Sequence, residues 1–517
     1  MVLDQSVMNV SISQLVADFD TSVTTIQAVI TLYSLTMAAL MITGGKFGDF
    51  WGRKRIFFIG LVVYGVGSGL TAVSWNVPAL TIGWSVLEGI GAAMVLPALV
   101  ALVAGNFEGS ARATAYGVLG GVAGAGIAVG PILGGWVTTN LTWRLVFVGE
   151  VVIVIGILLA TRLLREPESG DRPKSLDWVG SVLSALGLGL LVFGALQASN
   201  WGWLAPKNSP VEPFGFSLAP FVVAGGALTL AAFRAWERRR ERTGFDPLVH
   251  FRLFRIATLR GGLGMFLAQN LILMGIFFTV PLYLQVVQGF DAFQTGLRML
   301  PVSVTMLLTA ALASRLASRW PARPIVRVGL GLLLVATLLL ISTIDPNIDN
   351  TGFAIAMAIL GIGFGLIVSQ LGNVVQSSIN DQDRGEAGGL QYTAQQLGAA
   401  LGTALIGAVL ITGLSAAFEN KIADDPQISA DVSQQVSTRL DGQVSFVASD
   451  QVRTAATEAG LDQSTTSALV DSYEHAQLQA LKTALLFAAL VIVAAFWTTG
   501  RLPTQRFDQM AADSGAG

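Results

Sequence analysis

Cysteine is absent from this chain of 517 residues, which excludes disulfides, thiolate metal sites and cysteine nucleophiles. Histidine is nearly absent too, because His250 and His475 are the only two. They are far apart in sequence, so we interpret them as loop or surface residues and expect no metal site. No phosphate-binding loop or nucleophile triad appears either. These absences argue against an enzyme and predict no cofactor.

Charge is the next shortage. Charged residues make up 12% of the chain and hydrophobic residues 53%. Soluble domains are about one-quarter charged, and a soluble chain of this length needs polar residues to cover its core. The net charge of -2 and the lack of a basic domain give no reason to expect nucleic acid as a partner. The composition predicts a protein whose main surroundings are a lipid bilayer.

Long apolar runs divide the sequence. A bilayer-spanning helix needs about 20 mostly apolar residues, and lone strands cannot satisfy their backbone in lipid. The predicted spans lie at 27–45, 56–74, 78–103, 113–138, 145–163, 178–197, 216–235, 261–284, 294–314, 325–344, 353–375, 388–415 and 480–499. A weaker run at 1–17 is short and polar. We interpret it as the second half of a truncated first span and expect the natural start upstream.

The distribution of charge predicts the orientation. With both termini in the cytoplasm, most of the 31 lysines and arginines fall in cytoplasmic loops. This asymmetry follows the positive-inside rule and predicts a multi-pass protein of the plasma (inner) membrane. One large polar region, 419–478, then lies outside the cell. Its low apolar content argues against a packed domain, and it can be partly helical or disordered.

Two halves of the sequence repeat one pattern. Four residues recur at a constant offset: Arg112, Gly117, Gly126 and Gly130 reappear as Arg384, Gly389, Gly398 and Gly402. Related halves around a midplane site are a common design of secondary transporters. We predict an all-α membrane protein with two six-helix bundles and two inserted helices. The predicted divisions are 1–165, 166–245 and 246–517, the last including the polar loop 419–478.

The first motif follows the predicted span at 27–45. It reads Gly45-x-x-x-Asp49-x-x-Gly52-Arg53. Its glycines permit a tight turn, and Asp49 can take a helix N-terminus or pair with a base. We expect Asp49 to hold a cytoplasmic latch between the bundles. The alternative is an ordinary basic loop.

The second motif lies in the predicted span 113–138. It contains Gly126, Gly130, Pro131, Gly134 and Gly135. Small residues four apart let helices approach closely, and proline favours a kink. The motif therefore predicts a bend at a helix interface. Generic helix packing is the alternative.

Together the two motifs resemble the major facilitator superfamily, most closely its fourteen-span drug:proton antiporter family. Further resemblance is carried by Leu3-Asp4-x-x-Val7, Trp143-Arg144 and Pro281-Leu282-Tyr283-Leu284-Gln285. The resemblance implies a monomer that exports hydrophobic or cationic small molecules by alternating access, driven by protons. The antiporter motif argues against an uptake carrier or uniporter. A membrane sensor using 419–478 is the remaining alternative.

Four charged residues lie within or beside predicted spans: Asp4, Glu88, Glu150 and Arg298. A mid-membrane acid costs about 2.5–3.5 kcal/mol on insertion scales, so these are candidates for proton coupling. The resemblance implies this role for Asp4. The sequence also departs from the family, because Ser85-Val86-Leu87-Glu88-Gly89 stands in place of Arg-x-x-Gln-Gly, and Glu150 stands where asparagine is common.

Each charged candidate has a plainer interpretation. Glu88 can be a structural acid bonded to Ser85, and Glu150 can lie at the outer interface. Arg298 either neutralises an acid or extends to the membrane surface. A substrate cavity is predicted more weakly, since aromatic side chains at such positions usually pack. Its candidate lining residues are Tyr33, Gln269, Asn270, Phe277 and Gln285.

Overall fold

A computed structural model describes most of the chain. The described residues are 2–107, 115, 122, 126, 129–164, 166, 175–316, 320–346, 348–379, 384–425, 428 and 446–504. Arg112 and Gly117 of the sequence repeat lie outside them. Every regular element in this part of the chain is a helix, as predicted.

Twelve helices among the described residues are long and apolar enough to cross a membrane. The first predicted span is helical but broken, with α1 (Val2–Val10) followed by α2 (Ile12–Asp18). A further helix runs through 129–140. The longer helices are α3 (Val23–Trp51), α4 (Arg53–Ala72), α6 (Gly89–Asn106), α8 (Arg144–Ala160), α9 (Trp178–Trp201), α10 (Ala219–Arg242), α11 (Ala257–Leu282), α12 (Ala292–Leu316), α13 (Ala322–Thr343), α14 (Asn350–Ser377), α15 (Arg384–Asp424) and α18 (Gln463–Thr498).

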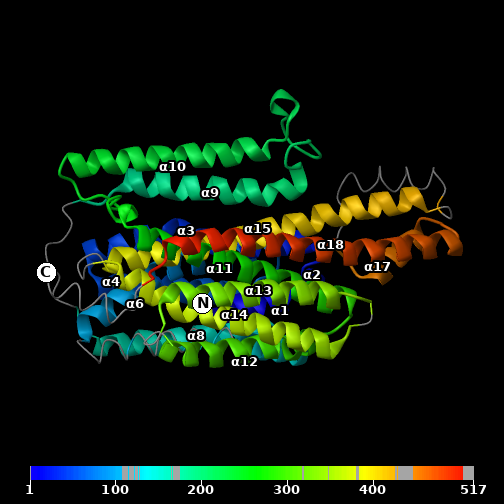
Figure 1. Ribbon diagram of the computed structural model, residues 1–517, viewed down its shortest axis with the longest axis horizontal. Helices are drawn as coiled ribbons and strands as arrows, with labels where there is room; N and C mark the ends of the chain where they lie inside the picture. Colours follow the sequence, from blue (N-terminus) through cyan, green and yellow to red (C-terminus); the bar gives the residue numbers. More distant parts are fainter. Residues whose placement is uncertain are drawn as a thin grey trace.

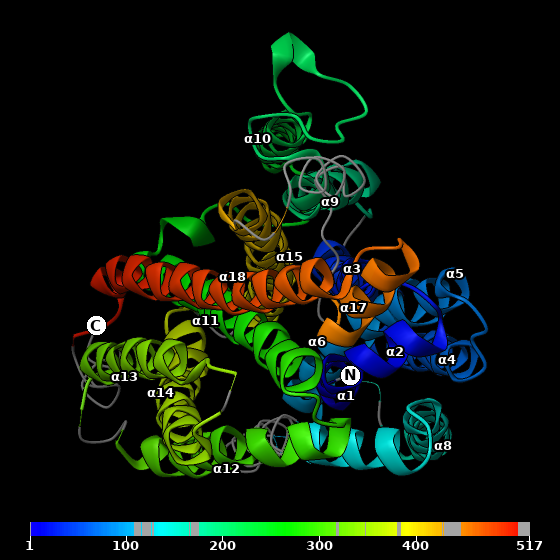
Figure 2. The same cartoon turned by 90° about the vertical axis from the view of Figure 1, so that its right-hand side faces the viewer.

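The helices form two bundles with a separate pair outside them (Figure 1). Helices up to α8 make one bundle and those from α11 onward make the other. They meet where α3 packs against α15, and α9 packs over this junction. Seen from one end, α9 and α10 project from the body, with α10 outermost (Figure 2). The predicted two bundles and two inserted helices are confirmed.

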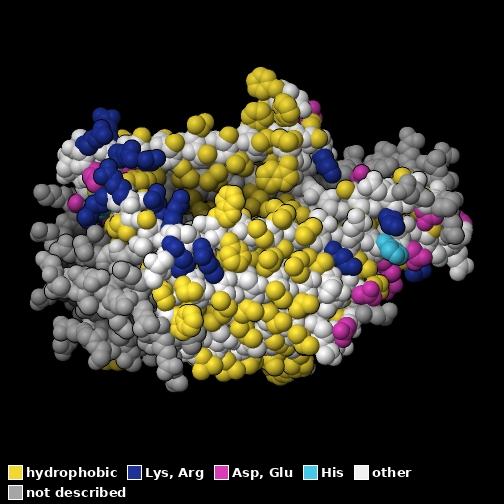
Figure 3. Space-filling view, viewed as in Figure 1, with side chains coloured by type: hydrophobic (Ala, Val, Ile, Leu, Met, Phe, Trp, Pro, Cys, Tyr) yellow, Lys and Arg dark blue, Asp and Glu magenta, His cyan; other side chains and the backbone are white. Residues whose placement is uncertain are grey.

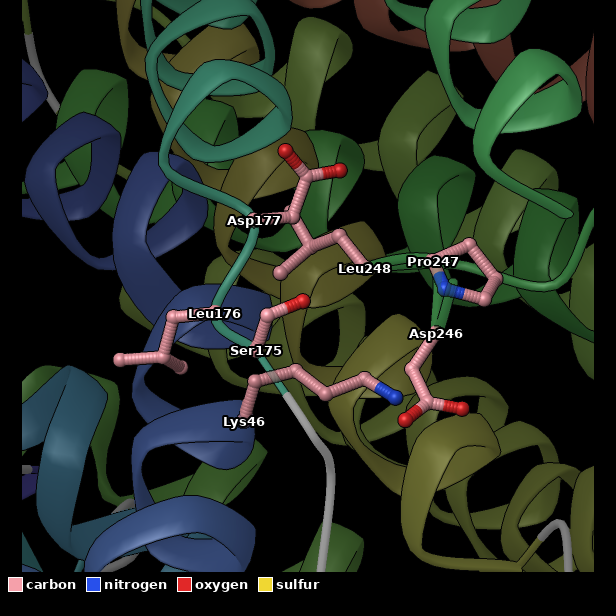
Figure 4. A pocket seen from close by; sticks show the side chains of 7 residues that line it. All are labelled: Lys46, Ser175, Leu176, Asp177, Asp246, Pro247 and Leu248. Atoms are coloured by element: carbon pink, nitrogen blue, oxygen red, sulfur yellow. The ribbon is translucent and has the colours of Figure 1, made fainter. Parts of the chain in front are cut away.

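The start of α9 and the end of α10 are tied by a buried polar network. Asp177 caps α9 through the amide of Gly180 at 2.8 Å and pairs with Arg240 of α10 at 3.1 Å. Glu237 is fully buried and accepts from the amide of Leu248 at 2.7 Å. Figure 4 shows a small pocket beside this network, lined by residues of α3, the start of α9 and the segment after α10. The inserted pair is therefore fastened to the chain that enters the second bundle.

The polar region 419–478 is partly helical. Here α15 continues to Asp424, α18 begins at Gln463, and α17 (Ser449–Glu458) packs on α18. The rings of Phe418 and Tyr473 lie 5.5 Å apart, and the Tyr473 hydroxyl accepts from the amide of Val447 at 2.9 Å. The expectation of a partly helical region is confirmed for the described part, where its few apolar residues converge on two extended helices. Residues 426–427 and 429–445 lie outside the described residues.

Candidate functional site

Three carboxylates predicted from separate helices meet inside the first bundle. Asp4 comes from α1, Glu150 from α8, and Glu88 from the last position of a π-helix, η1 (Thr81–Glu88). Their side chains are buried, with Asp4 and Glu88 0% exposed and Glu150 8%. One oxygen of each lies within 4.8 Å of the others. Sequence identified the three acids, and the fold brings them into one acidic cluster.

Aromatic donors surround Asp4. The Tyr33 hydroxyl of α3 donates to Asp4 Oδ2 at 3.0 Å, and the Trp84 indole N–H donates to the same oxygen at 3.2 Å. The rings of Tyr33 and Trp84 stack with centroids 4.6 Å apart. Tyr33, which sequence reasoning placed in a substrate cavity, thus holds a carboxylate. Trp84 was missed, although it lies in the same stretch as Glu88.

Helix α4 supplies donors to Glu150. The Tyr64 hydroxyl donates to Glu150 Oε2 at 3.0 Å and also reaches Asp4 Oδ2 at 3.4 Å. Ser68 donates to Glu150 Oε2 at 3.3 Å. Tyr64 and Ser68 are four residues apart, so they share one helix face. Two polar residues on one face of a predicted span were the sequence signal by which Tyr64 and Ser68 could have been identified.

Glu88 has a different setting. No donor in the described part of the chain makes a hydrogen bond to either of its carboxylate oxygens. Ser85 donates to the carbonyl of Val29 at 2.8 Å, so the alternative of a Ser85–Glu88 bond does not apply. Glu88 ends a stretch of π-helix, a local widening that is frequent at functional sites. Among the described residues, Glu88 therefore accepts fewer hydrogen bonds than Asp4 or Glu150.

The surroundings of the acidic cluster suit protons better than a metal. Carboxylate oxygens can ligate hard cations, which need several oxygen ligands. Here the neighbours of Asp4 and Glu150 present hydrogens, and the indole N–H of Trp84 is a donor with no acceptor capacity. Three ionised carboxylates in a low-dielectric interior repel one another strongly. The arrangement favours a cluster that holds protons.

Arg298 is not brought to the acidic cluster. Its guanidinium lies over the ring of Phe290, 3.5 Å from the centroid, at the start of α12. It also donates to the carbonyl of Gln294 at 3.5 Å. A role in proton coupling for Arg298 stays a prediction without a contact to Asp4, Glu88 or Glu150.

The first motif forms the turn between α3 and α4. Gly52 has φ of 100°, a conformation that favours glycine, and it begins α4. Asp49 pairs with Arg53 at 3.3 Å, one helical turn away. Glu166 accepts from the amide of Arg53 at 2.7 Å. Gly45 faces Pro97 of α6. The Asp49–Arg53 pair is local to this turn, and Glu166 lies in the segment after α8. A role for Asp49 as a latch between the bundles stays a prediction.

The second motif lies where the bundles touch. A Cβ added at Gly135 would lie 2.3 Å from the carbonyl oxygen of Ala292 in α12. A Cβ added at Gly296 would lie 2.2 Å from the carbonyl oxygen of Pro131. In the helix through 129–140, Gly134 packs against Val7 of α1 and Gly130 is buried. Gly126, which precedes this stretch, is half-buried. The glycines thus allow backbone-to-backbone approach between the bundles.

Gln285 joins the same interface. Its side-chain amide donates to the carbonyl of Val10 in α1 at 2.7 Å, and its Oε1 accepts from the amide of Ser13 at 3.4 Å. Gln269 and Phe277 are buried in α11, and Asn270 donates to the carbonyl of Phe266 in its own helix at 3.0 Å. A substrate cavity lined by these residues stays a prediction.

Comparison with known proteins gives consistent results. Residues 1–403 match the model of the Major Facilitator Superfamily. The chain is 30% identical to a tetracenomycin C resistance and export protein of Streptomyces glaucescens, over 82% of this chain and 76% of that protein. It is 31% identical to a probable actinorhodin transporter of Streptomyces coelicolor, over 82% and 72%. An auto-inhibited POT family peptide transporter shares the fold, with a TM-score of 0.58 at 14% identity over 98% of this chain and 96% of that one.

Proposed function

The chain belongs to the major facilitator superfamily, and we propose that it is a proton-coupled antiporter that exports hydrophobic or cationic small molecules by alternating access. The acidic cluster of Asp4, Glu88 and Glu150 is the observation that carries this proposal. Relatives named for antibiotic resistance and export support an antibiotic-like substrate. We place the protein in the plasma membrane as a monomer, with both termini in the cytoplasm.

Burial and repulsion give the cluster its chemistry. Removing a carboxylate from water favours its neutral form, and a second carboxylate nearby favours it further. Asp4 and Glu150 each accept hydrogen bonds that stabilise a negative charge. Glu88 lacks such donors among the described residues, so it is the acid on which we place the exchangeable proton. Opening the site to water would favour release of that proton.

Export requires that one site alternates between two sides. The described bundles touch through the second motif and through Gln285, both near the extracytoplasmic ends of their helices in the proposed orientation. These contacts would have to separate when substrate leaves. Close glycine contacts that hold without long side chains suit an interface that opens and closes repeatedly.

Glu88→Gln tests the coupling role. The amide keeps the shape of the side chain and removes its titration. In proteoliposomes, uptake of ethidium driven by a pH gradient should fall at least about tenfold, the size expected when a proton-transfer group is lost. Exchange of ethidium across equal pH should survive. Glu212→Gln, which changes an exposed acid outside the cluster, is the matched control.

Two results would count against this proposal. If the wild-type pH dependence persists in Glu88→Gln, Glu88 is structural and Asp4 becomes the main candidate for the proton. If wild-type protein moves ethidium and a panel of antibiotics without any response to a pH gradient, proton coupling itself is wrong.

A further inference from the structure

One end of α10 carries a concentrated positive charge. Figure 3 shows lysine and arginine side chains gathered where α9 begins and α10 ends, beside a broad apolar surface. On α10 the exposed arginines are Arg234, Arg238, Arg239 and Arg242. The exposed acids nearest in sequence are Glu241 and Asp246, so positive charge dominates. Figure 4 shows the Lys46 side chain extending toward Asp246.

The buried network separates these arginines from their neighbour Arg240. The side chain of Arg240 is 15% exposed and pairs with Asp177, so its charge is neutralised within the protein. Arg238, Arg239 and Arg242 are exposed. Helical spacing puts Arg238 and Arg242 roughly opposite Arg240, with Arg239 roughly a quarter turn from it. Their charges therefore face the surroundings of α10 rather than the protein interior.

The surroundings of α10 are lipid along most of its length. Its main packing partner is α9, and the exposed face includes Phe221 and Leu228, the latter 72% exposed. A helix with such a face in a membrane protein presents it to acyl chains. Positions four and three residues apart continue that face from Leu228 to Ala235, then to Arg239 and Arg242. The lipid-facing stripe thus ends in arginine at the depth of the headgroups.

Small side chains leave space for lipid where the apolar face of α10 meets the arginines. Ala231, Ala232 and Ala235 are exposed on the turn before the arginines. Guanidinium groups form forked hydrogen bonds with phosphate, and basic clusters at the end of a span attract anionic lipid. An acidic protein partner would need a polar surface, whereas this stripe is continuous with the apolar face.

From this placement we propose that Arg238, Arg239 and Arg242 bind the phosphate headgroups of anionic phospholipids, whose acyl chains lie along the alanine and leucine face of α10. The inserted helices then attach the transporter to its lipid environment on one side. This inference requires only that α10 spans the membrane, and it is independent of proton coupling.

Native mass spectrometry of the full-length protein tests the proposal. Phosphatidylglycerol and phosphatidylcholine with identical acyl chains are titrated separately. Wild type should retain more phosphatidylglycerol, and Arg238→Gln/Arg239→Gln/Arg242→Gln should weaken its binding by about tenfold or more, given the attraction per basic residue. Lys207→Gln/Lys421→Gln/Arg453→Gln removes equal charge from exposed residues elsewhere and should leave binding unchanged.

Two further measurements identify the source of the phosphate and reveal whether loss of binding comes from misfolding. Inorganic phosphate at millimolar concentration should not displace the lipid, because it lacks acyl chains. Arg238→Lys/Arg239→Lys/Arg242→Lys keeps the charge and should retain lipid. The proposal is overturned if wild type shows no preference for phosphatidylglycerol, if both charge-removing variants lose binding equally, if phosphate displaces the lipid, or if the lysine variant loses binding as fully as the glutamine variant.

Discussion

At the scale of single residues, sequence found the acids but not their neighbours. Asp4, Glu88 and Glu150 stood out because a charge within a span is costly. Tyr64 and Ser68 left a signal only as a polar pair on one face of a span, and the role of Trp84 appears only when the helices converge. Gln285 shows the same limit, because its sequence context predicts a cavity while its contact with Val10 comes from the opposite bundle.

Asp18 is a residue-scale case outside the spans. Its carboxylate pairs with Arg144 at 3.0 Å and accepts from the Trp143 indole at 2.9 Å. Burial raises the pKa of Asp18, but hydrogen bonds from Gln14, Trp143 and Arg144 outweigh this and leave the pKa below its usual value. Arg144 also donates to the carbonyl of Ser74, so this contact joins α2, α8 and the segment that follows α4.

Asp18→Asn should lower stability by about 1 kcal/mol at neutral pH, a value reduced for partial exposure. Because the folded pKa is depressed, the stabilisation is present above the unfolded pKa of about 4 and is lost as pH falls through the folded value. Thermal unfolding of purified protein should show a lower midpoint for the variant at pH 7. The gap should close toward pH 3, and a gap that stays constant with pH would contradict the assignment.

At the scale of elements, helices were predictable because apolar length alone identifies a span. The existence of α9 and α10 follows from the same rule, although both helices extend beyond the predicted spans. The π-helix at Thr81–Glu88 has no comparable signal. The 419–478 region was harder to predict, because its composition does not show where its apolar residues lie. Its low average apolar content concealed Phe418 and Tyr473, whose rings meet because α15 and α18 extend side by side beyond the bundle. Phe446 is also buried in this region.

The glycine contacts between bundles give an element-scale prediction. Gly296→Ala places a methyl group against the Pro131 carbonyl, where 2.2 Å is available, so the helix through 129–140 and α12 must separate. Spin labels introduced at Asn140 and Ser342, in a chain without native cysteine, should report a longer distance between the end of the helix through 129–140 and the end of α13. Gly331→Ala is the matched control, since nothing lies within 4 Å of its added Cβ. An unchanged distance distribution in Gly296→Ala would show that this contact does not limit opening.

At the scale of the whole molecule, α1 links the acidic cluster to the contact between bundles. Asp4 lies in the cluster, Val7 packs on Gly134 of the second motif, and Val10 accepts the hydrogen bond from Gln285. These positions are three residues apart along one short helix. Such a rigid element can carry a local change of charge to a distant contact, provided both sites bias the same two arrangements.

This geometry predicts that Gln285 couples protonation to opening. Gln285→Ala removes the donor to Val10 and leaves the α1 carbonyl without that bond, a loss of about 1 kcal/mol in the contact between bundles. In wild type, the distance between labels at Asn140 and Ser342 should change with pH as the acidic cluster titrates. Gln285→Ala should lengthen the distance and weaken its dependence on pH.

Gln288→Ala is the control that isolates the link, because Gln288 bonds to Tyr283 and to the carbonyls of Asp345 and Pro346, all within the second bundle. That variant should respond to pH as wild type does. A double variant, Glu88→Gln with Gln285→Ala, should be no less responsive to pH than Glu88→Gln alone, since both changes interrupt one path. If their effects on the pH response instead add independently, α1 does not connect the two sites, and the acidic cluster must act on the interface through α3 and α15.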